Sequence, residues 1–274
     1  MAVTVYAFTC GWLTLPASIL LAGEEGNLTV PVPAYLIEHP KGRVLFDTGL
    51  HPDTQVDPDR RLGRLAPFHK VAFAPGEEIA ARLHTLEVAP GTIDFIVNSH
   101  LHFDHCGGNA QLPNATLLIQ RREWEAGHDA DLIDRVYYEP HDYDLGHRVQ
   151  TIDGEHDVFG DGSVTCLPTP GHTPGHQSLR VRTAGAEVVM TGDACYLRRT
   201  LEQLHLPSVM YDREQMLASL RRLRALREAG AMIITGHDPE TWQTIPQAPA
   251  PLVPGKAPDR VPPPFERQPA GKRD

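Results

Sequence analysis

A twelve-residue stretch near the middle of the chain constrains its fold and chemistry more than any other part. It runs from 98 to 109, reads N-S-H-L-H-F-D-H-C-G-G-N, and places three histidines and one aspartate within six positions. Imidazole nitrogens and a carboxylate oxygen are ligands that suit zinc and similar divalent ions. Four such ligands packed this tightly predict two adjacent metal positions, one with His100 and His102 and the other with Asp104 and His105. The alternative is a solvated loop rich in histidine, which rarely has this H-x-H-x-D-H spacing.

Three further residues are candidates to complete a two-metal site, because the loop alone holds too few ligands. His172, Asp193 and His237 occur in the contexts P-G-H-T-P-G-H, T-G-D-A and T-G-H-D, each after a strand-like run and beside a glycine. A carboxylate can bridge two cations and hold them at the ~3.5–4 Å used in two-metal hydrolysis. We therefore expect Asp193 as the bridge, with the other ligands divided into two sets: His100, His102 and His172; and Asp104, His105 and His237.

Several neighbouring residues have a weaker case for a role at the metals. Asp47, in F-D-T-G at the end of a predicted strand, can orient a ligating histidine through its outer ring nitrogen, or it can be an ordinary turn residue. His176 is interpreted as a structural residue or one that supports a ligand, because a rigid turn separates it from His172. Cys106 and Cys195 lie close to ligands in the sequence, but enough nitrogen and oxygen ligands are available without them.

Charge and cysteine content exclude some classes of function. The chain has 274 residues and a formal net charge of −10, so a basic surface for nucleic acid is not expected. Its four cysteines are widely spread and form no C-x-x-C pair, which favours a reducing compartment over a disulfide framework. No window reaches the roughly 18 apolar residues of a membrane span, and no basic residue precedes Lys41. We therefore expect a cytoplasmic protein without a membrane span.

The order of predicted elements indicates one domain at 1–245 followed by a proline-rich tail at 246–274. Helical spacing is clearest at 76–88 and 212–229, and strands are expected at 3–8, 34–38, 43–46, 93–97, 116–119, 148–152, 164–167, 178–181, 187–191 and 231–235. Two rounds of strands followed by a helix favour an α/β (α+β) fold with two sheets inside and helices outside, rather than a strictly parallel sheet. Nine of the 25 prolines fall in the tail, which is predicted to be disordered or draped over the surface.

The motifs and their order resemble the metallo-β-lactamase superfamily. The resemblance rests on H-L-H-F-D-H at 100–105, on F-D-T-G around Asp47, and on the later His172, Asp193 and His237. It spans roughly residues 3 to 239. It implies an αββα sandwich, in which two mixed sheets carry helices on their outer faces, and a dinuclear metal site at one edge of the sheets. Residues 1–245 would then form a hydrolase domain of this type.

Within that superfamily, three segments resemble the N-acyl-homoserine lactone lactonases, which degrade quorum-sensing signals. They are S-H-L-H-F-D-H-C-G-G-N, P-G-H-T-P-G-H-Q-S-L and D-A-C-Y, the last placing Tyr196 three residues after Asp193. The β-lactamases of the superfamily are exported and commonly carry cysteine where Asp193 stands, and glyoxalase II-like hydrolases usually add a C-terminal helical domain. Enzymes of the 4-pyridoxolactonase type match nearly as well, and they or other small-lactone and ester hydrolases are the alternative. A metal-loaded sensor without turnover is the alternative from a different class.

The resemblance implies two divalent ions per chain and a mechanism of ring opening. Zinc is expected, although manganese, iron or cobalt fit the same ligands. A hydroxide that bridges the metals would attack the lactone carbonyl carbon, and the Tyr196 hydroxyl would donate to the carbonyl oxygen. Asp104 would pass a proton to the departing alkoxide, and would therefore be catalytic as well as a ligand.

The residues that select the lactone are expected in 12–29 and in the irregular segment 51–73, which is either a lid or a surface excursion. Phe68 and Phe73, together with Phe103 in the metal loop, are candidates for an apolar substrate pocket. A long acyl chain needs such a pocket. The carboxylate of a pyridine-fused lactone instead needs a cation, for which the segment offers Arg60, Arg61, Arg64 and Lys70. The expected partner is a small lactone, and the resemblance adds a homodimer as an expectation.

Overall fold

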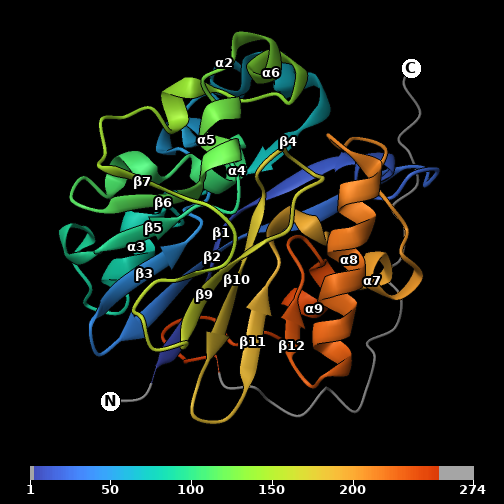
Figure 1. The fold of residues 1–274 in the computed structure, drawn as a ribbon. Helices are drawn as coiled ribbons and strands as arrows, with labels where there is room; N and C mark the ends of the chain where they lie inside the picture. Colours follow the sequence, from blue (N-terminus) through green and yellow to red (C-terminus); the bar gives the residue numbers. More distant parts are fainter. Residues whose placement is uncertain (1–2, 253–274) are drawn as a thin grey trace.

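Two packed β-sheets with helices on their outer faces make up residues 3–252, the part of the chain that the computed structural model describes (Figure 1). The seven-stranded sheet has the spatial order β4 (Lys70–Ala72), β1 (Thr4–Pro16), β2 (Asn27–His39), β3 (Gly42–Phe46), β5 (Phe95–Val97), β6 (Thr116–Gln120) and β7 (Val149–Ile152). The five-stranded sheet has the order β12 (Met232–Ile234), β11 (Glu187–Met190), β10 (Gln177–Arg182), β9 (Val164–Pro168) and β8 (His156–Asp157).

Both sheets are mixed, and helices cover the outer face of each. β2 and β3 pair antiparallel whereas β3 and β5 pair parallel, and the second sheet likewise combines both kinds of pairing. The helices are α1 (Ala17–Leu20), α2 (Pro58–Leu62), α3 (Ile79–His84), α4 (Phe103–Cys106), α5 (Arg121–Ala126), α6 (Ala130–Arg135), α7 (Arg198–Gln203), α8 (Arg213–Glu228) and α9 (Pro239–Trp242). The predicted αββα sandwich is confirmed.

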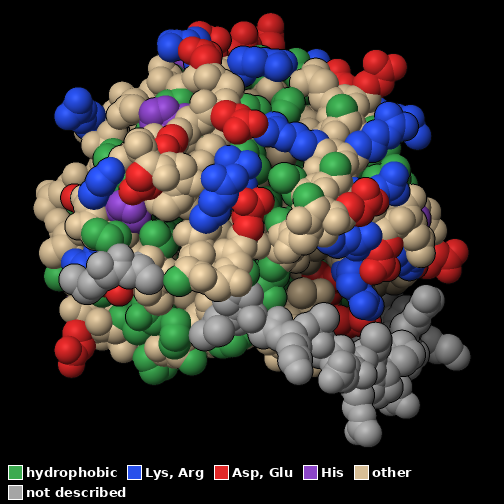
Figure 2. All heavy atoms as spheres, turned by 60° about the horizontal axis from the view of Figure 1, so that its bottom comes forward, with side chains coloured by type: hydrophobic (Ala, Val, Ile, Leu, Met, Phe, Trp, Pro, Cys, Tyr) green, Lys and Arg blue, Asp and Glu red, His purple; other side chains and the backbone are tan. Residues whose placement is uncertain are grey.

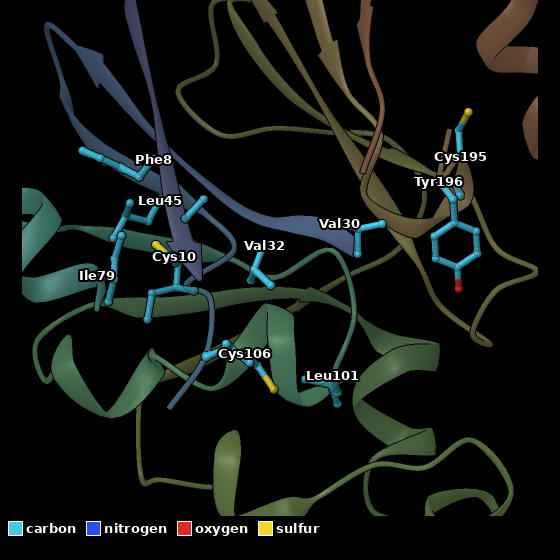
Figure 3. Packing of buried hydrophobic residues seen from close by; sticks show 14 of the residues in the cluster. Phe8, Cys10, Val30, Val32, Leu45, Ile79, Leu101, Cys106, Cys195 and Tyr196 are labelled. Carbon is cyan, nitrogen blue, oxygen red and sulfur yellow. The ribbon is translucent and has the colours of Figure 1, made fainter. Parts of the chain in front are cut away.

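Successive side chains of a strand point to opposite faces of its sheet, and this alternation divides the core into layers. In β3, Val44 and Phe46 belong to the cluster between the two sheets, whereas Leu45 belongs to the cluster under the helices. Figure 3 shows Leu45 close to Ile79 of α3, which covers this outer face. On the second sheet, α8 contributes Met216 and other apolar residues to the same kind of outer layer. Each fully buried side chain of this size contributes about 1.5–3 kcal/mol to folding, so this two-sided burial accounts for the sandwich.

Close backbone contacts hold the metal loop against the end of β3. The loop follows β5, which is parallel to β3, so both strands deliver their next residues to the same edge of the sheet. A Cβ on Gly108 would lie 2.3 Å from the carbonyl oxygen of Thr48, and one on Gly107 would lie 2.5 Å from the backbone nitrogen of His51. The two glycines after H-L-H-F-D-H are therefore required by packing, because any side chain there would push the two loops apart.

The predicted strands are all present, whereas several short elements were not expected. β4, β8 and α6 lacked a clear sequence pattern, and the helix expected at 76–88 is confined to α3, Ile79–His84. The helix expected at 212–229 is α8, which Asp212 caps by accepting a hydrogen bond from the Gln215 backbone. Elements of two to six residues are held by pairing with distant segments rather than by their own periodicity, which explains why pattern reasoning overlooks them.

The first residues of the predicted tail pack along β1. The backbone nitrogen of Ala248 donates to the carbonyl of Ala7, and that of Leu252 donates to the carbonyl of Val5. Leu252 is buried and belongs to the hydrophobic cluster between the two sheets. The remainder of the tail expected to be disordered or draped, residues 253–274, lies outside the described residues.

Two general properties of the described residues bear on possible partners. Between residues 3 and 252 no helix has the length and apolar character needed to cross a membrane. On the face shown in Figure 2, acidic and basic side chains lie close together, without a continuous stripe of either sign. Such a face does not generate the one-signed field that steers highly charged ligands.

Candidate metal centre

The residues predicted as ligands meet where the loops after β5, β9, β11 and β12 come together. They form two groups: His100, His102, His172 and Asp193; and Asp104, His105 and His237. Within each group the candidate ligand atoms all lie within 4.8 Å of one another. All of these side chains are buried except that of His102, which is half-buried. The structure thus brings every predicted ligand to one place, in the two sets expected from the sequence.

Three imidazoles form the first group. The Nε2 of His100 lies 2.8 Å from Nδ1 of His102. The Nε2 of His172 lies 3.1 Å from the first of these atoms and 3.0 Å from the second. Asp193 faces this triangle with Oδ2, which is 3.4 Å from the His172 nitrogen. Three nitrogens and one carboxylate oxygen therefore converge on one point.

The second group combines two imidazoles with the carboxylate of Asp104, and Asp193 faces this group as well. Asp104 Oδ2 lies 3.6 Å from Nε2 of His105 and 3.7 Å from Nε2 of His237. Asp193 faces the same two nitrogens with its other oxygen, Oδ1, at 3.2 and 3.0 Å. Because each oxygen of Asp193 is directed at a different group, this residue has the geometry of a bridging ligand.

Ring nitrogens that face away from the groups have partners of their own. His102 Nε2 donates to the Val136 carbonyl over 2.6 Å, and His237 Nδ1 donates to the Pro31 carbonyl over 2.8 Å. His105 Nδ1 lies 2.9 Å from Oδ2 of Asp47. Such acceptors hold the proton on the outward nitrogen, so that the inward nitrogen presents its lone pair to a metal. Asp47 is therefore placed to orient His105, as one of its two sequence interpretations required.

Two observations test whether cations fit these groups. The three inward nitrogens of the first group are 2.8–3.1 Å apart. At most one proton can lie between any two of them, so lone pairs face one another across the group. Asp193 Oδ1 is buried, and its contacts with Nε2 of His105 and His237, at 3.2 and 3.0 Å, lack hydrogen-bond geometry among residues 3–252. Leaving a buried polar atom unsatisfied costs about 1–3 kcal/mol. A divalent ion in each group would remove both problems, and histidine with aspartate is a donor set that zinc accepts.

The two groups differ in their electrostatics. Burial lowers the pKa of His100 and of His172 well below the ordinary value. Both imidazoles are therefore neutral, and each can offer a nitrogen lone pair to a metal. Burial acts in the same direction on His105 and His237, but the charge of Asp193 and Asp104 outweighs it and raises their pKa values. Burial also disfavours ionised Asp193, yet His105 and His237 hold its pKa well below the usual range. The second group therefore attracts positive charge.

Tyr196 lies against both groups. Its hydroxyl is 3.0 Å from Nδ1 of His172, and its ring stacks on that of His237 with centroids 5.9 Å apart. Burial, followed by the charges of Asp193 and Asp104, raises its pKa well above the ordinary value, so the phenol stays protonated. If His172 binds a metal through Nε2, its Nδ1–H donates to the tyrosine oxygen. The tyrosine proton is then free for another acceptor.

The nearby thiols belong to neither group. Figure 3 shows Cys195 and Tyr196 pointing to opposite sides of their segment. Burial raises the pKa of the Cys195 and Cys106 thiols, and the Cys106 sulfur donates to the carbonyl of His102. His176 supports the bridge instead, because its Nε2 accepts a hydrogen bond from the Asp193 backbone nitrogen over 3.0 Å.

The three phenylalanines proposed for a substrate pocket lie in different surroundings. Phe103 is half-buried, and its ring meets that of His69 edge-on with centroids 5.3 Å apart. Phe68 is 53% exposed. Phe73 is buried in the core, where a Cβ on Gly11 would touch its ring, and it lines neither of the cavities described below. A pocket role stays a prediction for Phe68 and Phe103, while the surroundings of Phe73 favour packing.

One cavity adjoins the site, and a second, larger cavity has no predicted ligand in its lining. A small one of about 40 Å³ touches two ligands of the first group and is lined by His102, Arg135, Val136, Tyr137, His172, Val209, Met210 and Tyr211. A larger one of about 560 Å³ is lined by His51, Asp53, Val56, Asp57, Arg60, Arg61 and His141. Sequence reasoning singled out neither 135–137 nor 209–211, because their polar and apolar residues follow no motif.

Two arginines of the segment 51–73 form ion pairs. Arg61 pairs with the buried carboxylate of Asp142. Arg64 pairs with Asp134, lies 3.6 Å from Glu139, and stacks over the ring of Tyr137. These contacts fasten the segment to residues 134–142, so it is tied to the wall of the small cavity rather than free of it.

The chain resembles known proteins over most of its length. Residues 28–237 match the family model of the Metallo-beta-lactamase superfamily. Over 234 residues the chain is 34% identical to N-acyl homoserine lactonase AttM of Azorhizobium caulinodans, covering 83% of this chain and 89% of that protein. Over 231 residues it is 33% identical to N-acyl homoserine lactonase AiiA of Bacillus thuringiensis subsp. kurstaki, covering 81% and 86%.

Solved structures show the same likeness. One is an N-acyl homoserine lactone hydrolase with the product N-hexanoyl-L-homoserine bound at its catalytic metal centre, with a TM-score of 0.81 and 29% identity. It matches 90% of this chain and 98% of its own. Another is a variant of B. thuringiensis AiiA with N-decanoyl-L-homoserine in its active site, with a TM-score of 0.81, 28% identity and coverage of 90% and 98%.

Proposed function

Because the chain belongs to the metallo-β-lactamase superfamily, we propose that it is a two-metal hydrolase that opens the ring of N-acyl-homoserine lactones. The observation that carries this proposal is the buried Tyr196 hydroxyl beside two complete ligand groups, in a chain 33–34% identical to curated N-acyl homoserine lactonases. The related structure with a ring-opened product at a metal centre supports the same reaction here. We propose zinc as the metal from the nitrogen and oxygen donors.

The chain's own residues supply positioning and proton transfer. When bound, two divalent ions would supply an activated water near neutral pH and positive charge near the carbonyl oxygen. Asp193 holds the two ligand groups in register, because each of its oxygens faces one of them. Tyr196 stays neutral and donates to the carbonyl oxygen as negative charge develops there.

Ring opening breaks the bond between the carbonyl carbon and the ring oxygen, and a proton must reach that oxygen. Asp104 is the carboxylate of the second group that does not bridge, and its Oδ2 faces His105 and His237. We propose that Asp104 carries the proton from the attacking water to the departing alkoxide. The product acid then ionises and releases one proton to the solution.

A pyridine-fused lactone with a carboxylate is the less favoured substrate. Its carboxylate needs a cation, and two of the four cations that segment 51–73 offers, Arg61 and Arg64, pair with Asp142 and Asp134. Tyr137 and Val209, which are 44% exposed at the small cavity, instead offer apolar surface beside the first group. A sensor without turnover is not favoured either, because the curated relatives are hydrolases.

A substrate panel tests the proposal. Purified protein loaded with about two zinc ions per chain is expected to release acid, measured by pH-stat, from acyl-homoserine lactones of several chain lengths. Pyridoxolactone is expected to react much more slowly, because the relatives that the chain resembles are N-acyl homoserine lactonases. Turnover of pyridoxolactone alone, or of neither class by the metal-loaded protein, would contradict the assigned substrate.

Shortening Phe68 tests the role of segment 51–73. Phe68→Ala is expected to lower kcat/KM about tenfold for long acyl chains, equivalent to ~1.4 kcal/mol of lost apolar contact, and to leave short chains unchanged. Its Tm should hardly move, because the side chain is already 53% exposed. Leu145→Ala, at 38% exposure elsewhere on the surface, is the control. An equal loss for all chain lengths would show that Phe68 does not contact the acyl chain.

A cytoplasmic location and a homodimer stay predictions. We propose the location from the cysteines, since Cys10, Cys106, Cys166 and Cys195 are all unpaired and buried. Sedimentation equilibrium measures the oligomeric state directly.

A further inference from the structure

Glu123 is a fully buried carboxylate that no sequence motif singles out. It lies in the first turn of α5 and accepts four hydrogen bonds. Its Oε1 accepts from the backbone nitrogen of Leu101 over 3.2 Å and from the hydroxyl of Tyr138. Its Oε2 accepts from the hydroxyl of Thr173 over 2.9 Å and from the backbone nitrogen of Gly175 over 2.8 Å. A carboxylate placed in this way joins segments that are far apart in the sequence.

Three of these four donors come from the segments that carry the first ligand group, and the fourth, Tyr138, comes from a segment that supports His102. Leu101 lies between His100 and His102, and Thr173 directly follows His172. Tyr138 is two residues from Val136, whose carbonyl accepts the outward proton of His102. Glu123 thus reaches the supporting structure of all three histidines while touching none of the converging nitrogens.

Packing brings the His172 loop directly onto α5. A Cβ on Gly175 would lie only 2.2 Å from the backbone nitrogen of Glu123, so this loop and the helix are in contact through their backbones. The second group has a different organiser, because Asp47 contacts His105 at 2.9 Å and accepts from the Ser99 backbone over 2.6 Å. Asp47 reaches His100 only through Ser99, whose Oγ donates to Asp47 over 2.8 Å and lies 2.9 Å from Nδ1 of His100. Asp47 is thus the direct support of the second group, whereas Glu123 contacts the segments of the first.

We infer that Glu123 is the positioning residue of the first metal group, holding His100, His102 and His172 in the arrangement that binds one of the two ions. The inference rests on the two-metal centre of the proposed function, and not on the identity of the lactone. Outer partners of this kind typically change metal affinity by about 10–100-fold when they are replaced.

The arrangement of donors explains why an amide cannot replace the carboxylate. Each oxygen of Glu123 accepts from one backbone N–H, that of Leu101 on one side and that of Gly175 on the other. A backbone N–H can only donate. In Glu123→Gln the side-chain NH₂ group would therefore face a backbone N–H in either orientation of the amide. The substitution keeps shape and volume but forces one pair of segments apart.

Cobalt binding separates the two groups experimentally. Chelator-treated protein is titrated with Co²⁺ alone, and binding is followed by calorimetry, by visible absorption and by the shifted proton NMR signals of the ring N–H groups. Wild type is expected to bind two ions. Glu123→Gln is expected to lower the affinity for one of the two ions about 10–100-fold. The shifted signals of His100, His102 and His172 are expected to be lost. Asp47→Asn is the matched comparison. It should lower chiefly the affinity for the ion held by His105 and His237.

A further variant separates effects on stability from effects on metal affinity. Asp142→Asn removes another buried carboxylate, which pairs with Arg61 and contacts no ligand, so it should lower Tm without changing either affinity. If circular dichroism shows that Glu123→Gln does not fold, Thr173→Val removes one of the four donors and should weaken the same ion several-fold. The role of Glu123 would be overturned by any of three results in the variant that folds. They are an equal loss of affinity for both ions, a selective loss of affinity for the second ion, and no change in either affinity.

Failure of the proposed function gives a different result. If wild type binds no Co²⁺, the two-metal centre and the role of Glu123 fall together. If wild type binds two ions but hydrolyses no acyl-homoserine lactone, the substrate is wrong, while selective loss of one ion in Glu123→Gln would still support the positioning role.

Discussion

Replacing Asp193 with alanine is expected to remove both metal ions and to reduce hydrolysis to background. Asp193 presents one oxygen to each ligand group, at 3.4 Å from the His172 nitrogen and 3.0 Å from the His237 nitrogen. It is also a main source of the negative charge that attracts cations to the second group, as the raised pKa values of His105 and His237 show. Loss of this ligand should weaken both ions by more than the ~10–100-fold typical of an outer partner.

Metal content measures this effect directly. Atomic absorption should find about two zinc ions per wild-type chain and fewer than one in Asp193→Ala, and chelator treatment of wild type should abolish hydrolysis in the same way. His237→Ala is the matched control, because His237 belongs only to the second group and its loss should spare the first ion. Two tightly bound ions in Asp193→Ala would exclude a bridging role.

Tyr196→Phe is expected to lower kcat by about 10²–10³-fold while both metals stay bound. The phenylalanine keeps the ring that stacks on His237 but removes the hydroxyl that donates to the developing negative charge. A lost oxyanion donor typically costs about 2.7–4 kcal/mol in the transition state, which corresponds to this range of rates. KM should change much less, because the hydrogen bond strengthens only as charge develops.

Metal content and the rate must be measured together in this variant. The Tyr196 hydroxyl is 3.0 Å from Nδ1 of His172, so its loss also removes a partner of one ligand. Steady-state kinetics on protein with a measured two ions per chain separates the two effects. Unchanged kcat would exclude Tyr196 as a donor to the carbonyl. Restored activity on addition of excess metal would assign it a supporting role at His172 instead.

The local spacing of ligands and glycines was sufficient to predict the centre. Constraints that act within a few residues produce two of these signals. They are the H-x-H-x-D-H spacing over six residues and the glycine beside each of His172, Asp193 and His237. The glycines recur because backbones meet there, as at Gly171, where a Cβ would lie 2.1 Å from the backbone nitrogen of Met216. The strands were equally readable, since Val44, Leu45 and Phe46 are all apolar in a strand buried on both faces.

Contacts between distant segments were decided only by the tertiary structure. The partners of Glu123 lie 22 and 52 residues away at Leu101 and Gly175, and no local pattern distinguishes it from an exposed glutamate in a short helix. Phe73 appears as a pocket candidate in the sequence, yet packing places it against Gly11 in the core. Residues 98–109, together with His172, Asp193 and His237, thus supplied the ligand atoms that the sequence predicts for two metals. Only the packing of α5, β3 and the later loops decided which buried carboxylates lie behind these ligands, because such contacts depend on where the chain returns in space.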